Sequence, residues 1–122
     1  MSKRIEATEM WFIRRMLRIS WTEKKTNEDV LAEAEYERSL MKKIETRKGK
    51  FIGHVMRKEG LENMITTGRL EGNRACGRPR YKILDDLTKW LGQARNTDTI
   101  RATRDRFEWR VMIANASKHG TR

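Results

Sequence analysis

The sequence is poor in the residues that build disulfides and metal sites. Its 122 residues include one cysteine, Cys76, so an internal disulfide framework is excluded. Only His54 and His119 remain as partners for that thiol, whereas structural zinc requires four Cys or His ligands at characteristic spacing. We therefore expect no metal and no cofactor. The free thiol is typical of a reducing compartment, so the predicted localisation is intracellular, in the nucleus or the cytoplasm.

Long apolar runs are also missing. No stretch approaches the roughly 20 apolar residues that span a bilayer. The charged segment of residues 1–8 lacks the apolar core of a secretory signal. A membrane is therefore not expected among the partners.

Patterns that support catalysis are sparse. His54 and His119 are the only side chains whose ordinary pKa lies near neutrality, and neither has a carboxylate at helical spacing to orient it. The neighbours Asp85 and Asp86 would point in different directions on a helix. A glycine-rich phosphate loop of the Walker type is absent. We expect that the chain is not an enzyme on its own.

Positive charge is what the chain has in excess. It holds 28 Lys and Arg against 17 Asp and Glu, a formal net charge of +11. The isoelectric point of about 10.3 lies above the value of about 9 that is typical of nucleic-acid-binding domains. Such a charge costs stability through self-repulsion and favours a polyanionic partner, either RNA or DNA.

The apolar periodicity predicts helices over about residues 4–19, 27–36, 37–58, 79–91 and 97–116. Residues 61–67 fit a short helix or a strand equally well. Thr26 or Asn27 can cap the second helix, Pro79 suits a first helical position, and Gly92 suits a left-handed cap. The predicted fold is mainly α, a small bundle of about four to five helices with a central Gly/Arg-rich loop. We expect a helical half over 1–68, the loop over 69–80 and a helical pair over 81–122, within one domain overall.

The helical spacings also predict which side chains pack inward. In the third helix the apolar stripe is Leu40, Ile44, Phe51 and Val55. In the last helix it is Ile100, Phe107, Val111 and Ala114, with Trp109, Met112 and Ile113 beside it. Gly49 and Gly53 weaken the third helix by about 1 kcal/mol each relative to alanine, so they mark either a bend or a close helix contact.

A basic stripe runs along the predicted third helix. Its members recur at steps of three and four residues, which places them on one helix face: Lys43, Arg47, Lys50, His54 and Arg57. The stripe lacks the acidic residues that would pair with it at i, i+4, so we interpret it as a phosphate-binding face, the alternative being a solvated outer face.

The last predicted helix carries arginines of two kinds. The spacing pairs Arg101 with Asp105, and Arg104 with Glu108. Arg106 and Arg110 have no such partner and remain candidates for phosphate contact.

The predicted loop contributes a second group of cations: Arg74, Arg78 and Arg80. The segment Gly77-Arg78-Pro79 is the core of the AT-hook, which lies in the narrow minor groove of A·T-rich DNA. Cys76 stands where that motif usually has arginine, so the match is partial. General phosphate contact by the loop is the alternative.

Four stretches together resemble the C-terminal region of endonuclease–reverse-transcriptase proteins of non-LTR (LINE-type) retrotransposons, of the RTE/BovB-like and jockey-like groups. They are EMWFIRRMLRISWTEKKTNEDVL (9–31), RSLMKKIETRKGKFIGHVMRKEG (38–60), LEGNRACGRPRYKILDDLTKW (70–90) and RDRFEWRVMIANA (104–116). The order of the stretches is that of the family, and they cover nearly the whole chain. The family's loop commonly reads Gly-Lys-Arg-x-Arg-Gly-Arg-Pro, and residues 72–79 hold two basic residues fewer.

The resemblance implies a tail that follows the polymerase core and contacts RNA or target DNA. The family's Tyr-x-Asp-Asp polymerase motif and its endonuclease residues are absent, so no such activity is implied here. The resemblance leaves open that Met1 begins a truncated or host-captured reading frame. Two alternatives stay open: a protein-interaction fragment that docks on a polymerase core through the exposed aromatics Trp11, Trp21 and Trp109, and a non-functional remnant of a mobile element.

Overall fold

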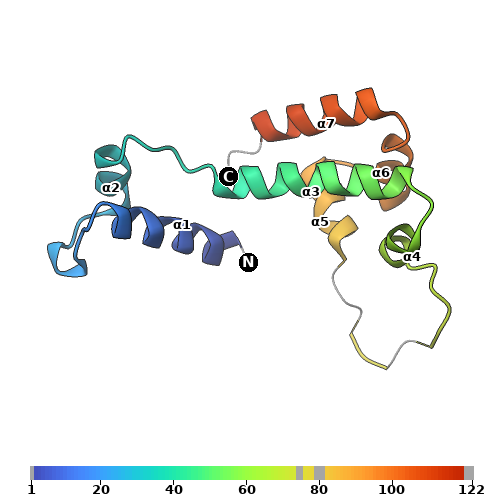
Figure 1. Ribbon diagram of the computed structural model, residues 1–122, viewed down its shortest axis with the longest axis horizontal. Coiled ribbons are helices and arrows are strands. Elements are labelled where there is room, and N and C mark those ends of the chain that lie inside the picture. The colour runs from blue at the N-terminus through green and yellow to red at the C-terminus, as the bar shows by residue number, and fades with distance from the viewer. Residues whose placement is uncertain (1, 74–75, 79–81, 120–122) are drawn as a thin grey trace. The chain divides into compact units, whose positions relative to one another are not determined.

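The computed structural model describes residues 2–73, 76–78 and 82–119, and the chain is mainly helical (Figure 1). Within those ranges there is no strand, and the elements are α1 (Ser2–Met16), the 3₁₀ turn η1 (Trp21–Glu23), α2 (Asn27–Glu33), α3 (Leu40–Arg57), α4 (Leu61–Thr67), α5 (Ile83–Trp90), α6 (Asn96–Ala102) and α7 (Arg106–His119). The predicted class is confirmed, but the predicted count of four to five helices is wrong. The undecided segment 61–67 is a helix.

The chain divides into two compact units, Met1–Ile44 and Glu45–Arg122, with the boundary inside α3. Each has its own small hydrophobic core, so each is described separately below. The predicted organisation into one domain overall remains a prediction. No helix in the described ranges is long and apolar enough to cross a membrane.

The first unit is built around α1 and α2. Met10, Ile13 and Val30 form its buried core. The buried carboxylate of Glu9 accepts hydrogen bonds from the Tyr36 hydroxyl (3.0 Å) and from the backbone N–H groups of Ser39 (3.1 Å) and Leu40 (3.0 Å). Because those N–H groups lie at the start of α3, the carboxylate satisfies donors that a helix leaves unpaired at its N-terminus.

Local caps in the first unit follow the sequence closely. Thr26 is the N-cap of α2, and its hydroxyl accepts from the backbone N–H of Asp29 (3.2 Å) while the Asp29 carboxylate accepts from the Thr26 N–H (3.3 Å). The Thr26 hydroxyl also donates to Asp29 Oδ2 (2.7 Å), and this hydrogen bond, followed by that of the Thr26 N–H, holds the pKa of Asp29 below its usual range. The predicted cap at Thr26 or Asn27 is confirmed, with Thr26 in that role.

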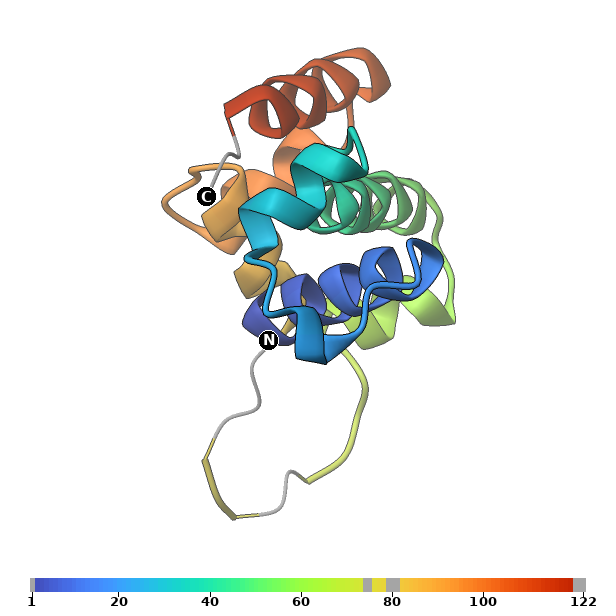
Figure 2. The same cartoon turned by 90° about the vertical axis from the view of Figure 1, so that its left-hand side faces the viewer.

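The second unit packs α5, α6 and α7 around α3. Its buried core consists of Ile52, Leu84, Leu87, Trp109 and Ile113. The helix α7 runs antiparallel to α3 and alongside it, as the two views in Figures 1 and 2 agree. The indole N–H of Trp109 donates to the carbonyl of Gly49 (2.9 Å), which fixes α7 against α3.

The two glycines of α3 permit this close approach. A Cβ at Gly53 would overlap the indole Nε1 of Trp109, and a Cβ at Gly49 would lie 3.1 Å from Ile113 Cδ1. Of the two predicted roles for these glycines, the close helix contact is therefore confirmed.

The predicted last helix over 97–116 is wrong, because the structure divides it into α6 and α7 at residues 103–105. The carboxylate of Asp105 accepts from the backbone N–H groups of Phe107 (2.8 Å) and Glu108 (3.1 Å), and so caps the start of α7. An aspartate that caps a new helix competes with continuation of the old one.

This break changes which side chains of α7 face inward. Trp109 is 2% exposed, whereas Phe107 is 74% exposed and Val111 also lies at the surface, so the predicted stripe through Phe107 and Val111 is wrong. In α3, Val55 is buried as predicted, but Phe51 is exposed and its neighbour Ile52 takes the inward position.

The segment between α4 and α5 carries no helix or strand at residues 69–73 and 76–78, which are the described part of the predicted loop. Pro79 lies outside the described residues, and α5 begins at Ile83. Gly92 follows Leu91, the C-cap of α5, with a φ of +69°, which confirms its predicted role as the left-handed residue that closes the helix.

Candidate nucleic-acid interface

A groove of about 760 Å³ lies between α3 and α7 in the second unit. Basic side chains from both helices line it: Lys50, His54 and Arg57 from α3, and Arg106, Arg110 and Lys118 from α7. Trp109, Ile113, Thr46, Ala114 and Ser117 complete the lining. The groove thus combines a partly apolar floor with cations on both walls.

The helical repeat explains why cations line both walls. On α7, Arg106, Arg110 and Lys118 are separated by four and eight residues, which places them along one face. On α3, Lys50, His54 and Arg57 recur at steps of four and three. Because Trp109 brings these two faces together, cations that are far apart in the sequence become neighbours.

Among the residues that the structure describes, no acidic side chain lines this groove. Glu45, the acidic residue within the basic stretch of α3, is half-buried away from the groove, where burial and the nearby Asp86 raise its pKa despite Lys48. Glu108 on α7 is exposed and lies outside the lining. The positive potential of the groove is therefore not neutralised by carboxylates of its own walls.

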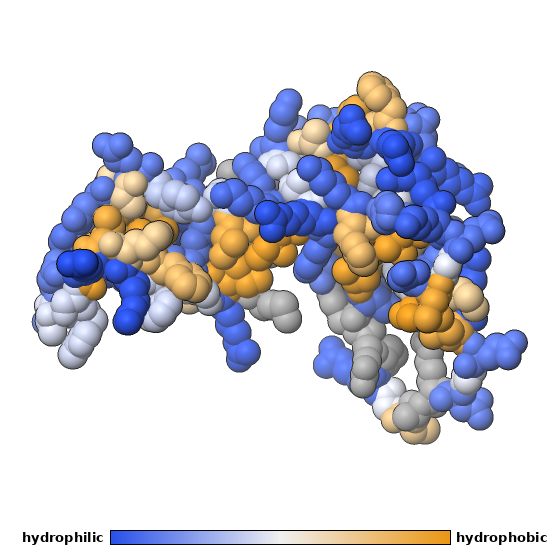
Figure 3. Space-filling model, viewed as in Figure 1, coloured by the Kyte–Doolittle hydropathy of each residue, from blue (hydrophilic) through white to orange (hydrophobic). Residues whose placement is uncertain are grey.

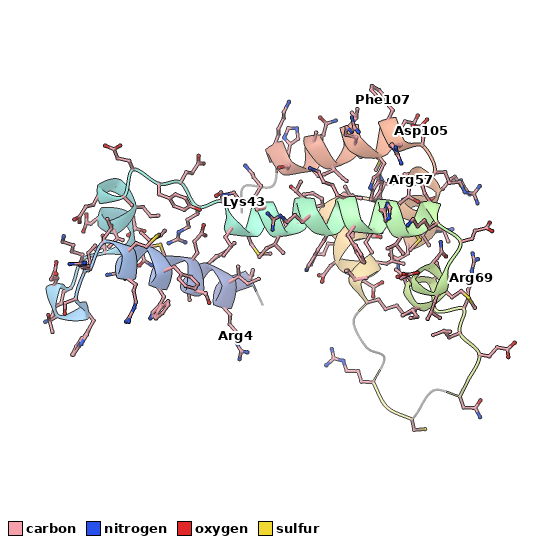
Figure 4. All side chains as sticks on the ribbon, viewed as in Figure 1. Arg4, Lys43, Arg57, Arg69, Asp105 and Phe107 are labelled. Atoms are coloured by element: carbon pink, nitrogen blue, oxygen red, sulfur yellow. The ribbon has the colours of Figure 1, made fainter. Side chains whose placement is uncertain are left out.

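Arg57 differs from the other cations of the groove. Its guanidinium Nη1 donates to the backbone carbonyl of Thr103 (2.9 Å), and its side chain is half-buried. Thr103 is the C-cap of α6, where backbone carbonyls lack helical partners and attract cations. Arg57 thus connects α3 to α6 at the C-terminal end of α3, opposite the end that carries Lys43 (Figure 4).

The structure brings together only part of the predicted site. Lys50, His54 and Arg57 line the groove, whereas Lys43 and Arg47 are exposed on α3 and do not. Arg78 is exposed, and two predicted site residues lie outside the described ranges: Arg74 and Arg80. Lys118 was not predicted as a site residue, because the periodicity of one helix does not show which residues of another helix lie across a groove from it.

The predicted ion pairs of the last helix are absent. Arg101 and Arg104 make no ion pair in the described residues, because the break at 103–105 removes the helical geometry that i, i+4 pairing needs. Arg106 and Arg110, which the sequence left without a partner, are exposed in the groove.

The aromatic residues predicted to dock on a polymerase core do not share one environment. Trp109 is buried, so its predicted exposure is wrong, whereas Trp11 and Trp21 are exposed. Hydrophobic side chains also gather at the surface over α4, where Leu61, Met64 and Ile65 are exposed (Figure 3).

Within residues 2–73, 76–78 and 82–119, no three His, Cys, Asp or Glu side chains lie close enough together to hold a metal ion. Comparison of the chain with protein-family models, with curated proteins and with solved structures found no match. The groove and its charges are therefore the features from which a function can be inferred.

Proposed function

We propose that the chain is a non-catalytic nucleic-acid-binding module whose α3–α7 groove binds the phosphates of RNA or DNA. The observation that carries this proposal is the convergence of six basic side chains on one groove, with no carboxylate among the described residues that line it. Each Lys or Arg that neutralises a phosphate releases condensed counterions, so a row of such contacts supplies sequence-independent affinity.

The proposal assigns different roles to the two kinds of groove residue. Lys50, Arg106 and Arg110 are exposed and are free to reach phosphates. Arg57 and Trp109 hold the helices together: Arg57 of α3 donates to the Thr103 carbonyl at the end of α6, and Trp109 of α7 donates to the Gly49 carbonyl of α3. The exposed cations therefore supply the binding, while Arg57 and Trp109 keep the walls of the groove in place.

The resemblance to retrotransposon proteins gives this module a proposed setting. In a full-length parent it would follow the reverse-transcriptase core and hold element RNA or target DNA. Lys43 and Arg47 of the basic stripe, and Arg74, Arg78 and Arg80 of the loop, would supply further phosphate contacts.

The test is fluorescence anisotropy with a labelled RNA hairpin and a labelled DNA duplex over a series of salt concentrations. The groove variant combines Lys50→Ala, Arg106→Ala and Arg110→Ala, all at exposed positions. The control combines Lys58→Ala, Lys89→Ala and Arg101→Ala, which are exposed in the same unit and outside the groove. Both variants lose three positive charges.

We expect the groove variant to lose at least about tenfold in affinity. The slope of log affinity against log salt concentration should become shallower by about one for each cation removed. The control should lose much less. Equal losses would show that net charge alone drives binding, and the groove would then have no special role. The RNA and DNA arms report which nucleic acid is preferred.

Docking on a polymerase core is the second candidate, because Trp11 and Trp21 remain exposed as that alternative requires. It predicts self-association or aggregation of the isolated chain, and no binding to either nucleic acid by folded protein at low salt. A non-functional remnant would bind weakly, without regard to sequence.

A further inference from the structure

The first unit carries a second cationic surface, at the C-terminal end of α1. A groove of about 810 Å³ there is lined by two tryptophans and five basic residues: Trp11, Trp21, Arg14, Arg15, Arg18, Lys24 and Lys25, with Ile19 and Ser20 between them. We call this the α1–η1 surface. It belongs to the first unit alone and shares no residue with the α3–α7 groove.

Trp21 is the most exposed large hydrophobic side chain of the described chain, with 87% of its surface accessible. It is nevertheless held in place by its backbone, because it is the first residue of η1. Ser20 caps this turn by accepting from the Thr22 N–H (3.4 Å), and the Glu23 carboxylate accepts from the Ser20 N–H (3.1 Å). The turn therefore presents an indole ring to solvent from an ordered backbone.

The two tryptophans of the surface are not equivalent. The Arg15 guanidinium lies over the Trp11 ring at 5.6 Å from its centroid, and the Phe12 ring meets Trp11 edge-on at 5.1 Å. Trp21 has no ring or cation contact in residues 2–73, 76–78 and 82–119. Trp21 is thus the ring whose faces are available to a ligand.

The basic residues of the surface also divide into two kinds. Arg14 donates to the Lys25 carbonyl (2.8 Å) and to Asn27 Oδ1 (3.0 Å), and so holds the turn onto α1. Lys25 pairs with Glu33 (2.8 Å) and Glu23 (3.5 Å), chiefly the former, which raises its pKa. Across the described ranges, the other three cations of this surface make neither an ion pair nor a side-chain hydrogen bond: Arg15, Arg18 and Lys24.

Two of those three cations sit in a backbone conformation that favours glycine. Arg18 has a φ of +55° and Lys24 a φ of +49°. A side chain at such a φ costs free energy that glycine would not, and residues of this kind cluster at functional sites. The sequence therefore keeps a positive charge on each side of Trp21 at some cost to stability.

We propose that the α1–η1 surface binds single-stranded nucleic acid, with an unpaired base stacked on Trp21 and flanking phosphates bound by Arg18 and Lys24. Every base has a π-face, so an exposed indole between cations suits a strand of any sequence. A protein partner would not require this pattern of charge. The proposal takes its class of ligand from the proposed function but depends on a separate surface.

The experiment uses the whole chain and two labelled single strands of about 12 nucleotides. One strand is intact, and the other has the same phosphate backbone but no bases. Anisotropy measures the ratio of the two affinities. We expect the wild-type chain to prefer the intact strand at least about fivefold, the preference to vanish in Trp21→Ala, and Trp21→Phe to keep part of it.

Glycine variants separate binding from stability. Arg18→Gly and Lys24→Gly should weaken binding to both strands, with a flatter salt dependence, while the melting temperature stays the same or rises. Glu35→Gly is the matched control, because Glu35 also has a positive φ, of +50°, but no positive charge to lose. It should leave binding unweakened.

Equal affinity of the wild-type chain for the intact and abasic strands would overturn the proposal, as would an unchanged preference in Trp21→Ala. Self-association of the chain that Trp21→Ala abolishes, without base preference, would assign the surface to a protein partner instead. The proposal for the α3–α7 groove would fail in a different way. In that case the variant that combines Lys50→Ala, Arg106→Ala and Arg110→Ala would bind duplex as tightly as the wild-type chain.

Discussion

At the scale of single residues, Gly53 and Trp109 decide whether the α3–α7 groove exists. The indole packs where a side chain at Gly53 would stand, and its N–H donates to the Gly49 carbonyl. The sequence shows Gly53 as a glycine inside a predicted helix, where it lowers helix stability and therefore needs a structural reason. Its partner could not be predicted, because Trp109 contacts α3 across 60 residues of chain and the helical period reports only neighbours on the same helix.

Gly53→Ala should therefore destabilise the second unit, by about 1–3 kcal/mol, because the added methyl group overlaps the indole. The higher helix propensity of alanine, worth about 1 kcal/mol, acts in the opposite direction. Chemical denaturation measures the net effect. Gly49→Ala is the comparison: its Cβ would lie 3.1 Å from both Cδ1 and Cγ1 of Ile113 and 3.6 Å from Trp90 Cζ3, which is tight but not an overlap, so it should cost less. A Gly53→Ala variant more stable than wild type would contradict the contact.

At the scale of elements, the helix caps account for most of the differences between prediction and structure. Thr26 and Gly92 have cap chemistry that is legible in the sequence, and both were predicted. Asp105 was read as an ion-pair partner of Arg101, although it caps α7. Apolar residues continue past it at helical spacing, so periodicity alone could not reveal the break or the outward positions of Phe107 and Val111.

The link between α5 and α6 is polar as well as apolar. The hydroxyls of Thr88 and Thr99 hydrogen-bond at 2.8 Å in the buried interior. The Asp85 carboxylate accepts from the Asn96 amide (2.7 Å) and from the Lys82 backbone N–H (3.0 Å). These two hydrogen bonds, the first above all, hold the pKa of Asp85 below its usual value of 3.8.

A lowered pKa in the folded state makes stability depend on pH. The contribution of Asp85 is fully present above pH 3.8 and is lost as the pH falls through its folded pKa. Asn96→Ala removes the main cause, so we expect a smaller loss of unfolding free energy with acid below about pH 4. Urea denaturation of both proteins at several pH values measures this loss. Asp29, whose pKa is also lowered, contributes equally to the wild-type chain and to the variant. An identical pH dependence in the two proteins would refute the assignment.

At the scale of the whole molecule, the net charge of +11 predicts attraction to a polyanion but not where the polyanion binds. The basic stripe of α3 located one wall of the groove. The other wall, on α7, required the tertiary contact, although Arg106 and Arg110 had been left as unpaired candidates. Nothing in the fold bears on the resemblance to retrotransposon proteins, which remains a proposal.

A titration of ¹⁵N-labelled chain with a short nucleic-acid duplex, followed by amide NMR shifts, tests directly whether the α3–α7 groove binds phosphates. If the groove binds phosphates, the largest shifts should fall in residues 50–57 of α3 and 106–118 of α7, and the variant that combines Lys50→Ala, Arg106→Ala and Arg110→Ala should lose them. Shifts confined to the segment 76–78 or to α1, or no shifts under conditions where the chain is folded, would contradict the groove as the site of phosphate binding.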